Sequence, residues 1–209
     1  MRDAIKAIAH GAATIIVLPA LISFVIRRTL LGADRALEGS AQALSLIPGL
    51  TGRYLRSAFL AQVLAGCDRS VVVEFGTLFS QVGARLDANV YVGPRCHLGL
   101  VHVARDVLIG AAVHIPSGPS THGTDDVDRP IREQPGTKKL VIIGEGTWIG
   151  SNAVVLESVG RHCIVAAGAV VTSPLPDYSV AAGVPARVIK HRRLSEATPE
   201  DRRGAAVGS

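Results

Sequence analysis

The sequence has few aromatic residues, few charged residues and no paired-cysteine motif. Aromatic side chains make up 4% of the 209 residues and charged side chains 19%, whereas hydrophobic residues reach 48%. That apolar content excludes a disordered chain, and glycine has no three-residue period, which excludes collagen. Cys67, Cys96 and Cys163 are an odd, widely spaced set without a CxxC pair, so disulfides and a zinc cluster are poorly supported and a reducing compartment fits best.

The positive charge gathers near the C-terminus. The net charge is +5, and residues 187–209 hold six basic against three acidic side chains. We expect residues 191–209 to form a basic, flexible tail that is either simply solvated or faces an anionic ligand or membrane headgroups. No nucleic-acid partner is expected, because the basic residues are not interleaved with aromatic ones.

The N-terminal segment is strongly apolar. Residues 7–26 carry no formal charge, basic residues flank them on both sides, and a helix of that length just spans the hydrocarbon core of a bilayer. Three interpretations stay open: a spanning or re-entrant membrane helix kinked at Pro19, a helix lying in the interface or docked on the protein, and a cleaved signal peptide. We expect residues 1–70 to form an apolar, membrane-associated helical region.

A second apolar stretch, residues 40–66, is broken by Pro48-Gly49 and predicts one or two short helices near the membrane. Arg53 and Arg56 within it would face lipid headgroups, although simple surface exposure explains them equally well.

Beyond residue 70 an aliphatic or aromatic residue recurs about every six positions, and a small or acidic residue often follows it. Such a unit predicts one short strand and one corner, and three units close a triangular coil of about 18 residues. Coils of this kind stack through parallel strand pairing. An ordinary β-sandwich is the alternative. The repeat positions are Val73, Phe79, Leu86, Val92, Leu98, Val103, Ile109, Ile115, Ile143, Ile149, Val155, Val159, Val165 and Val171.

With these repeats, residues 71–190 resemble the hexapeptide-repeat acyltransferases, in particular the galactoside and maltose O-acetyltransferase branch. The resemblance rests on IGEGTWIGSNAVV at 143–155 and on VAAGAVVTSPLPDYSVAAGVPARVIK at 165–190. It implies an all-β fold, a left-handed parallel β-helix, here with an apolar helical N-terminal segment, and a homotrimer. We expect four to five coils, and a skipped corner between Val155 and Val159.

The repeat is interrupted by a polar excursion, residues 117–140. A long polar loop in a regular coil is usually functional, and this one contains His122, whose imidazole suits a general base at neutral pH. Asp125, Asp126 and Asp128 would orient the histidine or contact the acceptor; the alternative is an exposed histidine without a role. The resemblance implies that His122 is the catalytic base, with His-Gly in place of the family's usual His-Pro.

The resemblance also implies an acetyl-CoA groove, with the two basic residues of the set at the CoA phosphates. Its lining would be Trp148, Ser151, Ala167, Thr172, Arg187 and Lys190. Ser173 stands where relatives often have lysine, so one phosphate contact is expected to be missing.

Together these features predict an acetyl-CoA-dependent O-acetyltransferase acting on a sugar hydroxyl, without a metal. The apolar N-terminus resembles that of membrane-associated polysaccharide O-acetyltransferases of the colanic-acid type, which implies a lipid-linked glycan or sugar acceptor at the cytoplasmic side of the bacterial inner membrane. Two alternatives remain. One is a non-catalytic membrane-associated scaffold. The other is a zinc carbonic anhydrase-like enzyme, for which His97 and His102 have the spacing of one ligand pair but no third histidine precedes them at the required distance.

Overall fold

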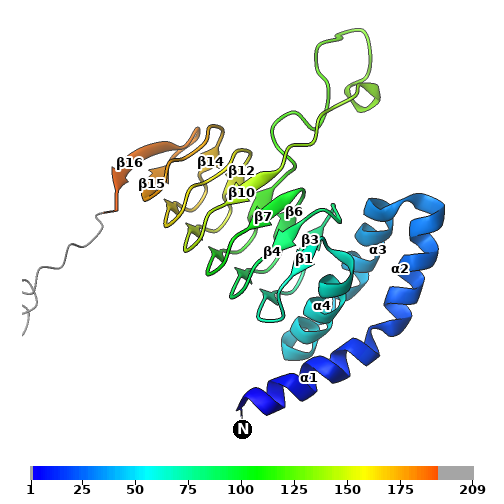
Figure 1. The fold of residues 1–209 in the computed structure, drawn as a ribbon. Coiled ribbons are helices and arrows are strands. Elements are labelled where there is room, and N and C mark those ends of the chain that lie inside the picture. The colour runs from blue at the N-terminus through cyan, green and yellow to red at the C-terminus, as the bar shows by residue number, and fades with distance from the viewer. Residues whose placement is uncertain (1, 193–209) are drawn as a thin grey trace, which may run out of the picture.

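The computed structural model describes the backbone of residues 2–192 and the side chains from Ile8 onward. It has two parts, four helices and then a parallel β-helix that they cover at one end (Figure 1). We call the four helices the helical collar. Of the predicted tail at 191–209, all but its first two residues lie outside the described part of the chain.

The helical collar follows the breaks that the sequence predicts. Its helices are α1 (Arg2–Ile16), α2 (Leu18–Leu31), α3 (Ala33–Ser45) and α4 (Gly49–Val63). Pro19 lies in the first turn of α2, where a missing N–H costs no helix hydrogen bond. Pro48 precedes α4 in an extended conformation, which ends the preceding apolar stretch.

The long uncharged segment is therefore a bent pair of helices. The axes of Ile8–Ile16 and Leu18–Leu31 differ by 47°. Within residues 2–192, no single helix is both long and apolar enough to cross a bilayer, while this bent pair meets the requirement by length and composition alone.

The β-helix has three sheets, one on each side of a triangular prism, and we name them A, B and C. Sheet A contains β1 (Gly66–Cys67), β4 (Arg85–Leu86), β7 (Val101–Val103) and β10 (Val141–Ile143). Sheet B contains β2 (Val72–Val73), β5 (Tyr91–Val92), β8 (Leu108–Ile109), β11 (Trp148–Ile149), β13 (Ile164–Val165), β15 (Ser179–Ala182) and β16 (Arg187–His191). Sheet C contains β3 (Leu78–Phe79), β6 (His97–Leu98), β9 (His114–Ile115), β12 (Val154–Val155) and β14 (Val170–Val171).

Pairing is parallel in all three sheets, and only the last strand, β16, runs antiparallel to its neighbour β15. Sheet B has six parallel strands, so the chain makes about six turns where we expected four to five. The expectation was too low because the first turn begins at Gly66, before the repeat is recognisable. The corner expected to be skipped between Val155 and Val159 is shortened instead, since Val159 still bridges Ile143 and Leu175 in line with sheet A.

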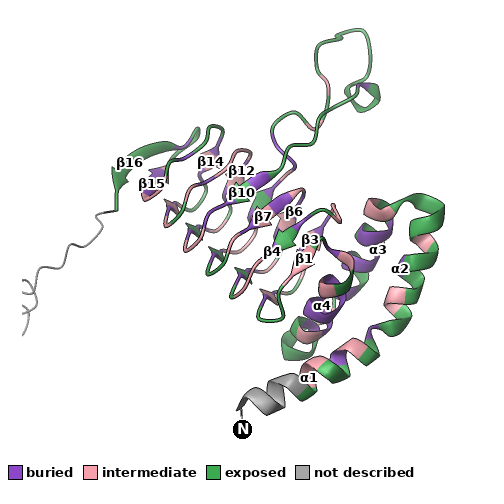
Figure 2. Cartoon of the chain, viewed as in Figure 1, coloured by how far each residue is buried: buried purple, intermediate pink, exposed green. Residues whose placement is uncertain are grey.

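The core of the β-helix is built from the repeat residues. Each of the 14 repeat positions has at most 2% of its surface exposed, and their inward positions form the buried stripes of Figure 2. Cys96 and Cys163 also point inward, as predicted, with 1% and 0% exposed. All three cysteines are free. Small, branched side chains fill the narrow prism, which explains the low aromatic content of the sequence.

Arg56 was wrongly expected at the surface, and it is 3% exposed. Its Nε donates to the carbonyl of Val73 at 3.0 Å, and its Nη1 donates to the carbonyls of Leu44 and Ile47 at 3.1 and 2.7 Å. These bonds join α4 to the end of α3 and to the first turn of the β-helix. Arg56 therefore fixes the collar to the coil and cannot face lipid headgroups.

Candidate active site

The excursion at 117–140 leaves the coil between β9 of sheet C and β10 of sheet A, and it projects far from the prism (Figure 1). Its two legs run side by side, since Thr137 N donates to Ser120 O at 2.7 Å and Lys139 N to Ser117 O at 2.8 Å. A Cβ on Gly136 would overlap the backbone of Thr121. The legs therefore need glycine there, and this close approach fixes the backbone just before His122.

The tip of the excursion is closed by one amide side chain. Gln134 is 8% exposed, and its Nε2 donates to the carbonyls of Asp126 and Arg129 at 2.6 and 2.8 Å. Its Oε1 accepts a hydrogen bond from Asp126 N at 3.1 Å. A buried amide with its bonds satisfied gives a polar loop a defined shape. The sequence held no motif that would have pointed to Gln134.

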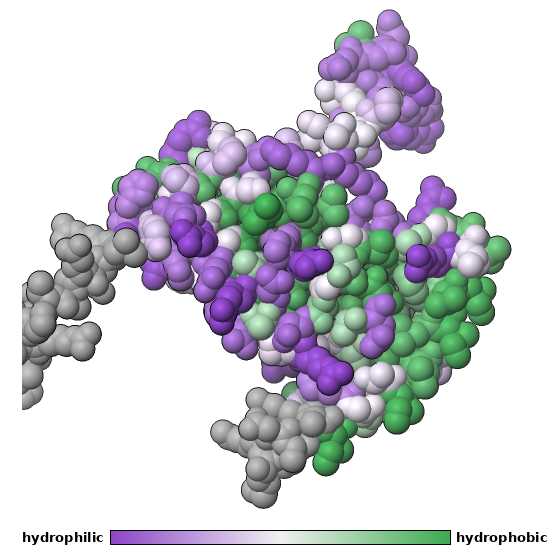
Figure 3. All heavy atoms as spheres, viewed as in Figure 1, coloured by the Kyte–Doolittle hydropathy of each residue, from purple (hydrophilic) through white to green (hydrophobic). Residues whose placement is uncertain are grey.

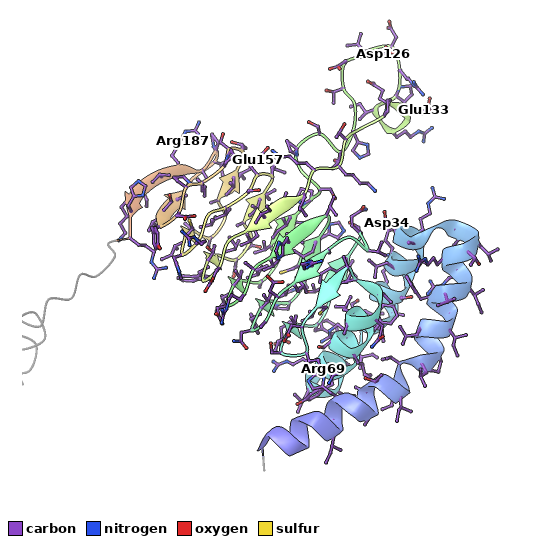
Figure 4. The ribbon with its side chains drawn as sticks, in the orientation of Figure 1. Asp34, Arg69, Asp126, Glu133, Glu157 and Arg187 are labelled. Atoms are coloured by element: carbon purple, nitrogen blue, oxygen red, sulfur yellow. The ribbon has the colours of Figure 1, made fainter. Side chains whose placement is uncertain are left out.

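Two lysines tie the base of the excursion to the rest of the molecule. Lys139 Nζ pairs with the Glu157 carboxylate at 2.7 Å, on the next turn of the coil. Lys138 Nζ lies 3.0 Å from Gln81 Oε1 and 3.5 Å from Asp34 Oδ2 of α3. Figure 4 shows Asp34 and Glu157 flanking the base of the excursion. These anchors join residues that are far apart in sequence, which is why we did not predict them.

His122 itself is exposed, as are Asp125 and Asp128. Asp128 N donates to Asp126 Oδ1 at 3.0 Å, a bond internal to the tip. Among the described residues, no hydrogen bond or ion pair joins His122 to Asp125, Asp126 or Asp128. A single chain thus presents the imidazole without an orienting carboxylate.

Three of the six predicted CoA-binding residues lie along one edge of the prism, between sheets B and C, which we call the B–C edge, and Trp148 lies on the outer side of sheet B. Trp148 is 51% exposed on β11. Ser151 and Ala167 occupy the same corner on successive turns, because Gly168 N donates to Ser151 O at 2.9 Å. Arg187 pairs with Ala182, the last residue of β15 before that corner, and is exposed there.

Successive corners at the B–C edge stack closely. Ser151 Oγ accepts a hydrogen bond from Ala111 N at 3.2 Å. A Cβ on Gly110 would lie 2.7 Å from Ser151 N, closer than real Cβ contacts allow. Small residues at this corner therefore bring backbone amides together along a continuous, accessible edge.

The other two predicted CoA-binding residues lie elsewhere. Thr172 follows β14 and faces the corner between sheets C and A, the same corner from which the excursion leaves. Lys190 pairs with Val180, toward the far end of β16 from Arg187. In a single chain, sheet C separates the excursion and its His122 from the B–C edge.

The histidines proposed as a zinc pair do not converge. His97 lies on sheet C and His102 on sheet A, so they face different sides of the prism. His97 is on strand β6 rather than at a corner, and its pKa is lowered by burial and by the nearby His114, whose ring centroid is 6.2 Å away. His102 Nε2 lies 2.9 Å from Asp87 Oδ2. Within residues 2–192, no group of three or more His, Cys, Asp or Glu is placed to hold a metal ion.

Comparison with known proteins shows to which family the chain belongs. Residues 141–173 match the family model described as bacterial transferase hexapeptide (six repeats). The chain is 33% identical over 141 residues to the Escherichia coli K12 protein named "Putative lipopolysaccharide biosynthesis O-acetyl transferase WbbJ", covering 56% of this chain and 71% of that protein. The chain belongs to the hexapeptide-repeat transferase family. Membership implies the left-handed sense of coiling that the sequence resemblance predicted.

Solved structures share the fold of this hexapeptide-repeat transferase. A maltose O-acetyltransferase from Clostridium difficile 630 superposes with a TM-score of 0.60 at 20% identity, covering 77% of this chain and 88% of that one. A hexapeptide-repeat acetyltransferase from Vibrio cholerae, solved with acetyl-CoA, has a TM-score of 0.55 at 19% identity, covering 76% of this chain and 88% of that one.

A further relative by sequence covers less of the chain. A probable acetyltransferase of Mycobacterium tuberculosis is 46% identical over 76 residues, which span 35% of this chain and only 25% of that protein.

The family match covers part of the candidate site. Trp148, Ser151, Ala167 and Thr172 fall within the matched residues 141–173 of this transferase, whereas the excursion and β16 fall outside them. The roles proposed for His122, Arg187 and Lys190 therefore rest on the position and exposure of their side chains and not on the family match.

Proposed function

We propose that this protein transfers an acetyl group from acetyl-CoA to a hydroxyl of a sugar, in a lipid-linked glycan or sugar intermediate of polysaccharide biosynthesis. The observation that carries the proposal is the excursion. It is a polar loop with its own hydrogen-bonded tip and two lysine anchors. It projects from the β-helix and carries an exposed histidine, His122. A non-catalytic scaffold requires no such loop. The similarity to the Escherichia coli O-acetyl transferase supports an acceptor of this class.

His122 acts as the general base in this proposal. Its imidazole takes the proton of the acceptor hydroxyl while the oxygen attacks the thioester carbonyl. The tetrahedral oxyanion then collapses, the carbon–sulfur bond breaks, and the CoA thiolate leaves as the acetyl ester forms. Backbone N–H groups of a neighbouring coil would stabilise the oxyanion. Asp125 and Asp128, exposed near the same loop, are proposed to contact the acceptor.

Acetyl-CoA is proposed to lie along the B–C edge. Trp148 offers an exposed aromatic face, and the corner at Ser151 and Ala167 offers small residues that admit a ligand close to the backbone. Arg187 would hold a CoA phosphate, because a guanidinium binds phosphate oxygens in a bidentate way. Lys190, further along β16, would contribute its charge to the same phosphate region, and Thr172 would border the groove from the neighbouring edge.

The separation of these parts supports a homotrimer. His122 belongs to the corner between sheets C and A, whereas Ser151, Ala167 and Arg187 belong to the B–C edge of the same chain. A rotation axis that places the first corner of one subunit against the second edge of another completes each site. We therefore propose that each active site forms between two subunits.

Membrane attachment is proposed through α1 and α2. Their inner side packs on α3 and α4 through Ala13, Val17 and Phe24, which are 2–4% exposed. Their outer side leaves apolar residues in the open, and Figure 3 shows this surface over α2. The exposed residues are Ile8, Ile15, Ile16, Leu18, Ile22, Val25, Ile26, Leu30 and Leu31.

A helix pair that is packed on protein along one side is better suited to lie in the membrane interface than to cross the bilayer. Because acetyl-CoA is a cytosolic donor, the attachment is proposed at the cytoplasmic side of the bacterial inner membrane.

The proposal is tested by incubating purified protein with labelled acetyl-CoA and membranes that contain lipid-linked glycans. We expect label in an alkali-labile ester on the glycan, and none with the His122→Ala variant. If the wild-type protein neither binds acetyl-CoA nor releases CoA, the transferase proposal is wrong and a scaffold is favoured.

A further inference from the structure

A cleft lies between the helical collar and the first turns of the β-helix, far from the excursion. It consists of two adjoining cavities of about 310 and 390 Å³, which share His10 of α1, Ser57 of α4 and Arg69 of the coil. Figure 4 shows Arg69 at this end of the molecule, close to α1. The volumes fall in the range of small-molecule sites. None of the residues assigned to acetyl transfer lines either cavity.

The charge of the cleft has one sign. Arg53, Arg69 and His10 line it, and neither cavity has a carboxylate in its wall. Arg53 Nη2 pairs with Glu74 Oε1 at 2.6 Å, outside the wall, and keeps 45% of its side chain exposed. Two guanidinium groups lining one cleft favour an anion, and guanidinium groups bind phosphate oxygens with particular strength. Burial and the nearby Arg69 lower the pKa of His10, which favours its neutral imidazole, so this side chain adds a hydrogen-bonding group and no charge.

A residue of the cleft wall has a buried hydroxyl without a partner. Ser57 is 3% exposed, and its Oγ has no hydrogen-bond partner among the described residues. Leaving a buried hydroxyl unpaired costs free energy that a ligand oxygen can recover. Because Ser57 lines both cavities, its hydroxyl supports a polar ligand at the point where they meet.

The helices that form the cleft also expose large apolar side chains near it. Gly11 and Thr14 of α1 form part of its wall, and the same helix exposes Ile8 and Ile15 by 72% and 68%. Leu50 of α4, which is 64% exposed, lines the larger of the two cavities. A ligand with a phosphate head and hydrocarbon chains matches a cationic cleft that opens beside an exposed apolar helix.

We propose that the cleft formed by His10, Arg53, Ser57 and Arg69 binds the phosphate headgroup of an anionic membrane lipid. This inference rests on the membrane attachment proposed above and adds a specific headgroup site to it. The site would hold the first turn of the coil at the membrane surface, with the outer side of α1 and α2 among the acyl chains.

The experiment compares flotation of full-length protein with vesicles of phosphatidylcholine alone and of phosphatidylcholine with an equal share of phosphatidylglycerol. Arg69→Gln removes the charge from the cleft, and Arg95→Gln removes the same charge from an exposed position on the coil. We expect Arg69→Gln to lose about tenfold in affinity for the anionic vesicles, because a charge-assisted hydrogen bond is lost. Arg95→Gln should change it by less than about twofold.

Equal losses for the two arginine variants would overturn the headgroup site, since general surface charge would then explain the binding. Ser57→Ala provides a second variant that breaks no hydrogen bond of the described chain. We expect it to keep the melting temperature and to bind the anionic vesicles severalfold more weakly, and unchanged binding would count against the site.

A further arm separates a lipid from a free anion. If millimolar inorganic phosphate raises the melting temperature of the wild-type protein while anionic and neutral vesicles bind equally, the cleft binds free phosphate and the lipid proposal is wrong. If the wild-type protein floats with neither vesicle, membrane attachment itself fails. Acetyl transfer to a soluble sugar, measured alongside, shows whether the catalytic proposal stands independently of either result.

Discussion

The β-helix and the helical collar use similar apolar residues in opposite ways. In the coil, every repeat residue is at most 2% exposed, because the six-residue period sends each one into the prism. In α1 and α2, nine large apolar residues are 48–76% exposed, because these helices bury only one side, against α3 and α4. Burial in the coil explains stability, whereas exposure on the collar calls for a partner such as a lipid surface.

The excursion is a third region and differs from both. Its residues are polar and mostly exposed (Figure 2), and its shape comes from hydrogen bonds at Gln134 and ion pairs at its base. In the function proposed above, the coil is the rigid support, the collar attaches the protein to the membrane and the excursion carries the catalytic base. Substitutions in the three regions should therefore affect different measurements.

The largest effect is expected for His122→Ala. Acetyl transfer should fall by about 100- to 10,000-fold, the usual contribution of a general base. Acetyl-CoA binding and the melting temperature should stay close to wild type, because the side chain is exposed. His102→Gln is the matched control, since an amide can keep the hydrogen bond to Asp87, and its turnover should be unchanged. Equal turnover in the two variants would remove His122 from the mechanism.

Stability should depend on the coil interior, and two adjacent isoleucines of β10 test this. Ile143 is 0% exposed and Ile142 is 45% exposed. Ile143→Ala should lower the free energy of unfolding by about 2–5 kcal/mol, since a cavity forms in a packed core. Ile142→Ala should cost less than about 1 kcal/mol. Chemical denaturation measures both, and similar losses would mean that the outer side of sheet A is buried in the assembly.

Sequence alone predicted the coil because its information is local. The period, the corners and the inward cysteines all follow from side chains six residues apart. The breaks at Pro19 and Pro48 are also local, because proline restricts its own backbone and that of the preceding residue. The anchors were not predictable in this way. Arg56 bonds carbonyls up to 17 residues away, and Lys138 approaches Asp34 across 104 positions, so neither leaves a periodic signal.

For the candidate site, the sequence predicted a set of residues, and the structure shows how these residues are arranged in one chain. The prediction placed six residues in one groove, whereas the chain puts Thr172 at the corner of the excursion and separates His122 from the B–C edge by sheet C. The reason is that a triangular coil distributes consecutive segments over three sides, so closeness in sequence does not decide closeness in space.

A smaller effect is expected at the B–C edge. Arg187→Gln combined with Lys190→Gln should raise the KM for acetyl-CoA by about tenfold or more, because charge-assisted bonds to phosphate are lost, and kcat should change little. Steady-state kinetics at saturating acceptor measures the split. Arg95→Gln together with Arg35→Gln removes two charges from exposed positions and serves as the charge-matched control. An unchanged KM in the Arg187 and Lys190 double variant would place the CoA phosphates elsewhere.

The collar should show the smallest effect on folding and a clear one on location. Ile22→Ser with Ile26→Ser replaces two side chains that are 60% and 56% exposed. We expect release from membranes in cell fractionation, with a melting temperature within a few degrees of wild type. Ala36 and Leu37, both 0% exposed on α3, provide the contrast, since Leu37→Ala should destabilise the protein instead. A wild-type protein that is already soluble would contradict the assignment of α1 and α2.

The most direct test of the account is isothermal titration of acetyl-CoA into the wild-type protein and into the His122→Ala variant. We expect both proteins to bind with similar affinity, because the B–C edge holds the donor and the excursion holds the base in the proposed mechanism. Only the wild-type protein should transfer the acetyl group. Absence of binding by either protein would contradict the central claim that this coil is an acetyl-CoA-dependent transferase.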